Sequence, residues 1–206
     1  MLGIYAIAAG RARASGAAHG FSLVELMIGL AILAFLLMMG VPAFGTFLQN
    51  AKLRAAAENF YAGLQTARAE AVTRNLPVQF ILTTDSGVAG NVATTNLSTS
   101  GGNWIVRVQD PISLAYTFIE GRPAAEGSGQ RGTTTVSVSS TDSSITFNGF
   151  GATTLGATAT LAFTNPNGGA CAPAGPMRCL NIAVSVGGQS RLCDPAVTAT
   201  GDTRKC

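Results

Sequence analysis

Hydrophobic and polar positions divide the chain into an apolar run, an amphipathic segment and a region of short alternating runs. The apolar run, residues 26–51, holds 26 residues without a charged side chain. A helix of about 20 apolar residues crosses a bilayer, whereas core helices seldom run this long without a charge. We therefore expect residues 21–48 to form a transmembrane helix, in which Pro42 removes one hydrogen bond and kinks or locally melts the helix.

The segment that follows, residues 49–76, has the pattern of an amphipathic helix. Its apolar residues recur at intervals of four and three, and they are Leu53, Ala57, Phe60, Leu64, Ala67 and Ala71. Glu70 and Arg74 stand four residues apart in the favourable order. Pro77 predicts the end of the helix, because the residue before a proline leaves the α region. A helix over residues 22–75 would be roughly 80 Å long.

Residues 77–206 alternate short apolar runs with Gly, Pro, Asn and Asp, the residues expected between strands. Strands are predicted at residues 78–83, 104–109, 112–119, 134–139, 144–148, 158–164 and 180–186. Residues 84–103 and 121–132 are rich in Gly, Ser, Thr and Asn and are predicted to be loops. Because a sheet needs a partner layer, we expect strands to cover the apolar stripe of the helix, which gives an α+β fold.

A carboxylate near the start of the apolar run marks a candidate functional site. Glu25 follows Phe21-Ser22-Leu23-Val24, and a charge inside a membrane helix is costly unless a cation pairs with it. No cationic side chain lies nearby in the helix. The small residues that end in Gly20 precede the apolar run, whereas a secretory signal is cleaved after its apolar region.

The run from Gly20 to Leu26, GFSLVEL, followed by the apolar stretch, resembles the type III signal of type IV pilins and pseudopilins. The resemblance implies that residues 1–20 are a leader, that a prepilin peptidase cuts between Gly20 and Phe21, and that Phe21 is N-methylated. It also supplies a cation, since the α-ammonium group of Phe21 in one subunit can pair with Glu25 of another. The alternative is that Glu25 reaches the membrane interface unpaired.

Residues 54–60, 64–71 and 74–75 are similar to the GspH/FimT group, which contains the minor pseudopilin H of type II secretion and the minor pilin FimT. The runs at 191–195, RLCDP, and 204–206, RKC, resemble FimT more. The resemblance implies a long N-terminal helix packed on a C-terminal antiparallel β domain. It also implies a single-pass anchor in the inner membrane, with the β domain in the periplasm.

The same resemblance predicts the function and the partners. The partners are other pilin or pseudopilin subunits, the prepilin peptidase, an assembly platform of the inner membrane, and membrane lipid. The predicted function is a minor pilin that primes or caps a type IV pilus. A pseudopilin of type II secretion is the alternative, and a DNA receptor for natural transformation is a further one.

Four cysteines lie in the last 36 residues, and four cysteines allow three pairings. The simplest pairing joins Cys171 to Cys179 and Cys193 to Cys206, so that each bridge closes a short loop. Disulfides persist in the periplasm, and each would contribute around 3 kcal/mol. Zinc is the alternative, but the spacing lacks a C-x₂-C knuckle, and no metal site is predicted.

Composition and charge exclude several function classes. A net charge of +3, with 11% charged residues, excludes nucleic-acid binding by overall charge. Loss of the leader removes Arg11, Arg13 and the only histidine, His19, so the net charge falls by two, from +3 to +1. The remaining chain would lack an imidazole base for Ser-His or Cys-His catalysis. We therefore expect a protein that is not an enzyme and has no cofactor.

A weaker resemblance concerns DNA, which some FimT-like proteins are thought to bind through a Gly-Arg-x-Arg element before the late Cys-Asp-Pro. Here the element is Gly188-Gln189-Ser190-Arg191, so Gln189 replaces the first arginine. Arg178, Arg204 and Lys205 would complete a basic patch if the disulfides gathered them. Two to four phosphate contacts give weak, salt-sensitive binding, and an ordinary solvated tail is the favoured alternative.

Overall fold

The computed structural model describes residues 20–85, 87, 89–93, 95–123 and 136–206, without the side chains of residues 39–43, 91 and 123. The chain divides into two compact units, Met1–Val41 and Pro42–Cys206. One long helix contributes residues to both units, and all the strands in the described residues belong to the second.

The helices are α1 (Leu23–Arg74), η1 (Ala89–Asn91) and η2 (Pro166–Gly168). The strands are β1 (Val78–Thr83), β2 (Asn103–Gln109), β3 (Tyr116–Pro123), β4 (Ser137–Ser140), β5 (Ser144–Phe147), β6 (Ala159–Thr164), β7 (Leu180–Val184) and β8 (Ser190–Cys193). The predicted helix over residues 22–75 is thus confirmed to within one residue at each end. It continues through Pro42, so of the two predicted effects of this proline, a kink or local melting, the melting does not occur.

The end of α1 follows from local sequence. Asn75 has φ 52°, the left-handed conformation with which helices often end, and Pro77 stands two residues further on. In the last turn, Arg74 Nε donates a hydrogen bond to Glu70 Oε2 at 2.6 Å. This is the predicted i,i+4 pair, and because it is partly exposed it contributes only about 0.3–0.5 kcal/mol.

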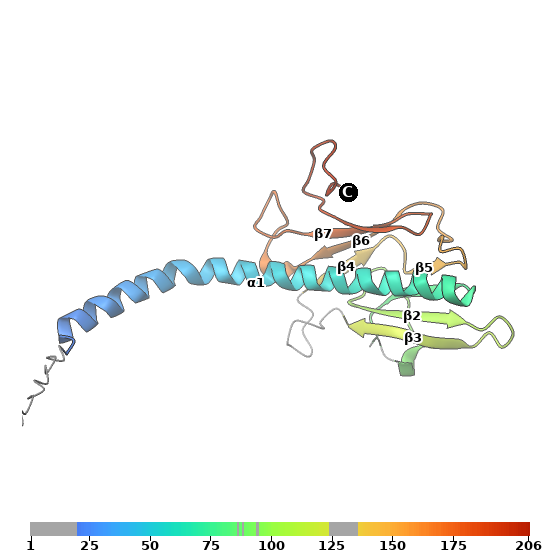
Figure 1. The fold of residues 1–206 in the computed structure, drawn as a ribbon, viewed down its shortest axis with the longest axis horizontal. Helices are drawn as coiled ribbons and strands as arrows, with labels where there is room; N and C mark the ends of the chain where they lie inside the picture. The colour runs from blue at the N-terminus through green and yellow to red at the C-terminus, as the bar shows by residue number, and fades with distance from the viewer. Residues whose placement is uncertain (1–19, 86, 88, 94, 124–135) are drawn as a thin grey trace, which may run out of the picture. The chain divides into compact units, whose positions relative to one another are not determined.

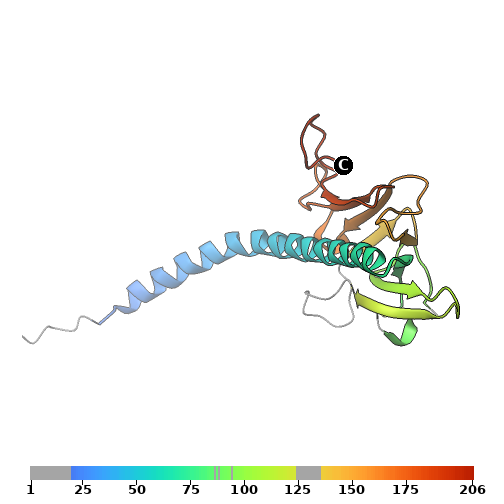
Figure 2. The same ribbon diagram turned by 45° about the vertical axis from the view of Figure 1, so that its right-hand side comes forward.

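Two four-stranded antiparallel sheets pack along the part of α1 that belongs to the second unit (Figures 1 and 2). Sheet A has the order β3-β2-β1-β5, and sheet B has the order β4-β6-β7-β8. In sheet A, Val78 pairs with Val108 on one side and with Phe147 on the other. Because Val78 follows the end of α1 by only four residues, this end of β1 and of its two neighbouring strands lies where α1 finishes.

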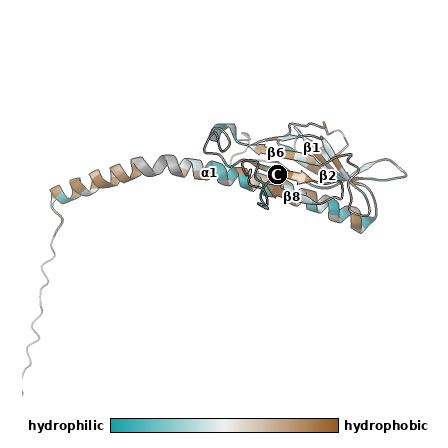
Figure 3. Ribbon diagram, turned by 90° about the horizontal axis from the view of Figure 1, so that it is seen from above, coloured by the Kyte–Doolittle hydropathy of each residue, from teal (hydrophilic) through white to brown (hydrophobic). Residues whose placement is uncertain are grey.

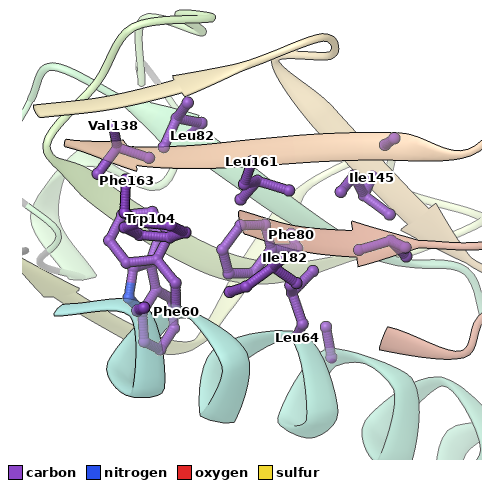
Figure 4. Packing of buried hydrophobic residues seen from close by; sticks show 14 of the residues in the cluster. Phe60, Leu64, Phe80, Leu82, Trp104, Val138, Ile145, Leu161, Phe163 and Ile182 are labelled. Atoms are coloured by element: carbon purple, nitrogen blue, oxygen red, sulfur yellow. The ribbon is translucent and has the colours of Figure 1, made fainter. Parts of the chain in front are cut away.

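Phe60 of α1 belongs to a core that both sheets share (Figure 4). Its ring meets Phe80 of β1 at 6.1 Å and Phe163 of β6 at 5.2 Å, in both cases edge to face. All six residues of the predicted apolar stripe are buried: Leu53, Ala57, Phe60, Leu64, Ala67 and Ala71. The prediction that strands cover this stripe is therefore confirmed, and with it the α+β fold.

Trp104 of β2 lies directly against α1 because Gly63 has no side chain. A Cβ atom built at Gly63 would stand 2.7 Å from carbons of the indole ring, closer than side chains pack. The indole N–H donates a hydrogen bond to Asn59 Oδ1 at 2.7 Å, which satisfies the one polar group of this buried ring.

Two predicted strands begin several residues later in the structure, and one observed strand was not predicted. β3 begins at Tyr116 instead of residue 112, because Asp110 Oδ1 accepts hydrogen bonds from the N–H groups of Ile112 and Ser113 and turns the chain there. β8 (Ser190–Cys193) was not predicted, although strands were predicted at β4 and β5, which have the same length. β4 begins at Ser137, and residues 134 and 135 of the predicted strand lie outside the described residues.

Arg107 of β2, which alternates with the core residues of its strand, is nevertheless buried, with 6% of its surface exposed. Its Nε donates to Gln79 Oε1 at 3.0 Å, its Nη1 donates to the Val92 carbonyl at 2.7 Å, and its guanidinium lies 3.6 Å from the centre of the Tyr116 ring. Burial lowers the pKa of Arg107, an effect that Tyr116 partly opposes. The segment that contains Val92 therefore covers this face of sheet A.

Candidate functional site

The peptide bond between Gly20 and Phe21 lies in irregular chain directly before α1. The Phe21 side chain is 88% exposed, and a Cβ atom at Gly20 would meet nothing within 4 Å. The predicted cleavage site is thus accessible on this chain, as proteolysis requires. Residues 1–19, with His19 and most of the predicted leader, lie outside the described residues.

Ser22 and Glu25 form a capping box at the start of α1. The Glu25 N–H donates to Ser22 Oγ at 3.1 Å, and the Ser22 N–H donates to Glu25 Oε2 at 3.2 Å. The helix dipole also favours a negative charge in this first turn. Ser22 is therefore a site residue that the sequence analysis missed, although the S-x-x-E signature of a capping box was visible.

Glu25 borders an apolar hollow of about 340 Å³ on the first turns of α1, lined also by Phe21, Leu26, Gly29, Leu30 and Leu33. Residues 20–51 contain no Lys, Arg or His. A cation next to Glu25 must therefore come from elsewhere. Cleavage before Phe21 would create one, since it frees an α-amino group that is charged near neutral pH.

The first part of α1 consists largely of hydrophobic residues (Figure 3), and their side chains are exposed. The exposed residues are Leu23, Val24, Leu26, Met27, Ile28, Leu30, Ile32, Leu33, Phe35, Leu36, Leu37 and Met38. A helix that is apolar all round is normally buried in a membrane or among other helices. Within the described residues, no helix has a stretch that is long and apolar enough to count as a membrane span.

The structure contains two disulfides, Cys171–Cys179 and Cys193–Cys206, with Cα atoms 5.5 and 5.1 Å apart. These are the two pairs that the sequence analysis expects. The second bridge ties the last residue to β8, and beside it the Asp194 N–H donates to the Arg204 carbonyl at 2.7 Å. In the part of the chain that is described, no His, Cys, Asp and Glu side chains gather into a metal-binding group.

The five residues predicted as possible DNA contacts do not form one patch. Arg178 and Arg204 line one groove, whereas Gln189 and Arg191 line a separate hollow beside Cys206. Lys205 turns back on its own tail and donates from Nζ to the Thr198 carbonyl at 3.3 Å.

Two of these cations also have partners within the tail. Arg204 Nη2 lies 2.7 Å from Asp202 Oδ2, and this hydrogen bond holds the pKa of Asp202 down at about 2. Arg191 Nη2 donates to the Cys206 carbonyl at 3.4 Å. The backbone N–H of Arg178 donates to Asn50 Oδ1 at 2.7 Å.

The groove that holds Arg178 and Arg204 has a volume of about 540 Å³ and was not predicted from the sequence. We call it the α1–β8 groove, and its lining is Phe47, Asn50, Ala51, Arg54, Arg178, Leu180, Leu192, Cys193, Asp194 and Arg204. Its lining combines apolar side chains with three arginines, Arg54, Arg178 and Arg204. No local pattern reveals it, because its residues come from four distant parts of the chain.

Comparisons with known proteins agree with this geometry. The model of the type II transport protein GspH family matches residues 56–188. The model of the prokaryotic N-terminal methylation motif matches residues 16–41. Comparison with curated proteins finds no match.

Among solved structures, the type IV minor pilin FimU of Pseudomonas aeruginosa is similar in two crystal forms. The first is 20% identical with a TM-score of 0.50, over 71% of this chain and 91% of that one. The second is 18% identical with a TM-score of 0.47, over 68% and 90%. At this identity the first match shows a shared fold. Because the GspH model covers well over half of the 206 residues, the chain belongs to the GspH family of type II transport proteins.

Proposed function

We propose that the chain is a minor pilin that is anchored in the inner membrane by residues 21–48 and assembled into a type IV pilus, which it primes or caps. A prepilin peptidase removes residues 1–20, and Phe21 is N-methylated. The observation that carries the proposal is Glu25, a carboxylate held by Ser22 at the head of an apolar helix. The match of the methylation motif to residues 16–41 supports it.

In this mechanism, processing creates the cation that Glu25 lacks. Cleavage frees the α-ammonium group of Phe21. This group stays at the start of its own helix, and from there it can approach Glu25 of a neighbouring subunit. In a medium of low dielectric the two charges stabilise each other, and removing one partner of such a pair costs about 3–5 kcal/mol. The pair fixes the register between neighbours, while the exposed apolar side chains of α1 supply the packing.

The test compares three variants of the full chain in cells that assemble the filament. Glu25→Ala removes the charge and the cap, whereas Glu25→Gln keeps a capping-box acceptor and removes only the charge. Both are expected to remain in the membrane and to lose about tenfold or more of their share in sheared filaments. Glu25→Asp, which keeps the charge, should lose less than either.

Mass spectrometry of the mature chain is the second measurement, and it identifies the N-terminal residue and its methylation. The expected N-terminus is a methylated Phe21. Normal incorporation of Glu25→Gln would overturn the ion pair, and an N-terminus other than Phe21 would overturn the assignment of the cleavage site.

A pseudopilin role in type II secretion is the second candidate, and the family description of the matching model favours it. Both candidates use the same anchor and the same ion pair, so only the partner apparatus separates them. Deletion of the chain should abolish piliation in the first case and secretion of exported proteins in the second. Restoration by the intact chain, but not by Glu25→Gln, connects either phenotype to this site.

A further alternative is that the tail binds DNA for natural transformation. It rests on Arg178 and Arg191, the tail arginines that line two separate surfaces. Two phosphate contacts give a slope of about −2 in a plot of log affinity against log salt. Fluorescence anisotropy of the full chain with duplex DNA at low salt tests this, with Arg191→Gln as the weakened variant.

A further inference from the structure

The α1–β8 groove begins where the proposed membrane anchor ends. Phe47 belongs to the anchor, residues 21–48. It lines the groove together with three later residues of α1, which are Asn50, Ala51 and Arg54. A helix over residues 21–48 would be about 42 Å long, close to the thickness of a bilayer with its headgroups. In the proposed function, the groove therefore lies at the level of the lipid phosphates.

Apolar side chains continue from the end of the anchor into the groove. Phe44, Phe47 and Leu48 of α1 are exposed. Leu180 of β7 and Leu192 of β8 line the groove from sheet B. The volume of the groove, about 540 Å³, is within the range of pockets that hold small ligands. An acyl chain that lies along Phe44 and Phe47 can therefore bring its headgroup to this groove.

Arg178 supplies a positive charge to the groove. The residue is exposed and, among the described residues, no ion pair joins it to a carboxylate. Asn50 of α1 holds the backbone here, because its Oδ1 accepts the Arg178 N–H at 2.7 Å and its Nδ2 donates to the Pro176 carbonyl at 3.3 Å. A guanidinium binds a phosphate through two parallel N–H donors, so Arg178 is suited to a phosphodiester.

Asp194 is the one carboxylate among the residues that line the groove, and Arg204 partly compensates its charge. Arg204 Nη2 donates to Asp202 Oδ2 at 2.7 Å. This hydrogen bond and, to a lesser extent, the nearby charge of Asp194 raise the pKa of Arg204. Because Arg204 already interacts with two carboxylates, we assign it no part in binding an anion.

Arg54 retains donors for a phosphate, although it has a partner. Its Nε lies 2.8 Å from Glu58 Oε1, and both side chains are exposed. Exposed pairs of this kind contribute little to stability, and this one uses a single member of the five N–H donors of the guanidinium. Arg54 and Arg178 are therefore the two cations of the groove that we expect to contact an anion.

We propose that the α1–β8 groove binds the headgroup of an anionic phospholipid of the inner membrane, with the phosphate at Arg178 and Arg54. The site rests on the proposed function, because the anchor is what places the groove at the headgroup layer. The apolar lining favours a lipid over free phosphate, which has no acyl chain to bury. The two arginines favour a lipid with a net negative charge over a zwitterionic one. A bound lipid would hold the β domain at the membrane until the chain is assembled.

The test reconstitutes the full chain in vesicles of phosphatidylcholine that contain phosphatidylglycerol with a photo-reactive group in its acyl chain, next to the glycerol. Adducts are located by mass spectrometry. Residues 21–48 should be labelled, as expected of any membrane anchor, and residues 178–194 should be labelled in addition. The same photo-reactive group on phosphatidylcholine is the matched control, and it should label residues 178–194 much less.

Three substitutions of single charges examine the headgroup contact. Arg178→Gln should lower the labelling of residues 178–194 by phosphatidylglycerol about fivefold, the effect of one basic residue at an anionic surface. Arg191→Gln removes an equal charge from a separate hollow and should leave the labelling nearly unchanged. Asp194→Asn keeps an oxygen that accepts the Ala196 N–H and removes the negative charge of the lining, so it should raise the labelling.

Two outcomes overturn the inference. One is equal labelling of residues 178–194 by the two lipids, which would mean that the groove takes up acyl chains without regard to the headgroup. The other is labelling of residues 21–48 alone, which would mean that the groove holds no lipid. A chain that is labelled in neither region is not in the membrane, and this result would count against the proposed function, so the two failures are distinguishable.

Discussion

At the scale of single residues, the contact between Gly63 and Trp104 limits how closely α1 and sheet A approach. Gly63→Ala gains helix propensity of about 1 kcal/mol, but its methyl group would lie 2.7 Å from the buried indole ring. Overpacking of this kind costs about 1–3 kcal/mol. We expect the free energy of unfolding to fall by about 1 kcal/mol.

Fluorescence of Trp104, the only tryptophan in the chain, reports this unfolding directly. Gly45→Ala is the matched control, because a Cβ atom at Gly45 would meet nothing within 4 Å on the same helix. It should leave stability unchanged or raise it by up to about 1 kcal/mol. Equal stability of Gly63→Ala and the wild type would show that the indole ring moves aside without cost.

A second residue-scale prediction concerns pH. The hydrogen bond from Arg204 holds the pKa of Asp202 at about 2, below the ordinary value of 3.8. Because the pKa is lowered in the folded state, the stabilisation by Asp202 is fully present above pH 3.8 and is lost as the pH falls through about 2. Carboxyl carbon NMR should therefore show a midpoint near 2 for Asp202. Arg204→Gln should return it toward 3.8, and Arg191→Gln should not.

At the scale of elements, the disulfide between Cys193 and Cys206 holds the tail on β8. Replacing both cysteines by alanine removes a link across 13 residues and should lower the free energy of unfolding by around 3 kcal/mol. We expect hydrogen exchange at Asp194, whose N–H bonds the Arg204 carbonyl, to become fast. Exchange at Ile182 in β7 should change little, and unaltered exchange at Asp194 would contradict this role of the bridge.

The same scale shows how far the sequence predicts the fold. Periodicity located α1 and most strands, because burial of one face imposes a repeat of 3.6 or 2 residues. It failed for β3, where the Asp110 side chain turns the chain before the strand begins. It also placed Arg107 on the side of its strand opposite the core, where the segment containing Val92 covers it. Side-chain hydrogen bonds and coverage by distant segments leave no periodic trace.

At the scale of the whole molecule, the parts of the site that are contiguous in sequence were predictable, and the assembled parts were not. The run from Gly20 to Glu25 carries its chemistry within six residues, and short cysteine loops favour the observed pairs. A single basic patch of tail cations was the less favoured expectation, against an ordinary solvated tail. The structure places Arg178 and Arg204 on one surface and Arg191 of β8 on another.

The last prediction concerns cleavage of the whole chain. A substitution at Gly20 tests cleavage separately from folding. A methyl group at Gly20 would touch nothing within 4 Å on this chain, so Gly20→Ala should leave the fold and the capping box unchanged. Any effect on cleavage then reports how the side chain at position 20 fits the peptidase. One added methyl group in a tight subsite lowers the rate of cleavage about tenfold or more. We expect the variant to accumulate as the uncleaved chain in the membrane and to be missing from sheared filaments, as measured by mass spectrometry. Gly45→Ala, in equally open space, should be cleaved normally, and efficient cleavage of Gly20→Ala would place the scissile bond elsewhere.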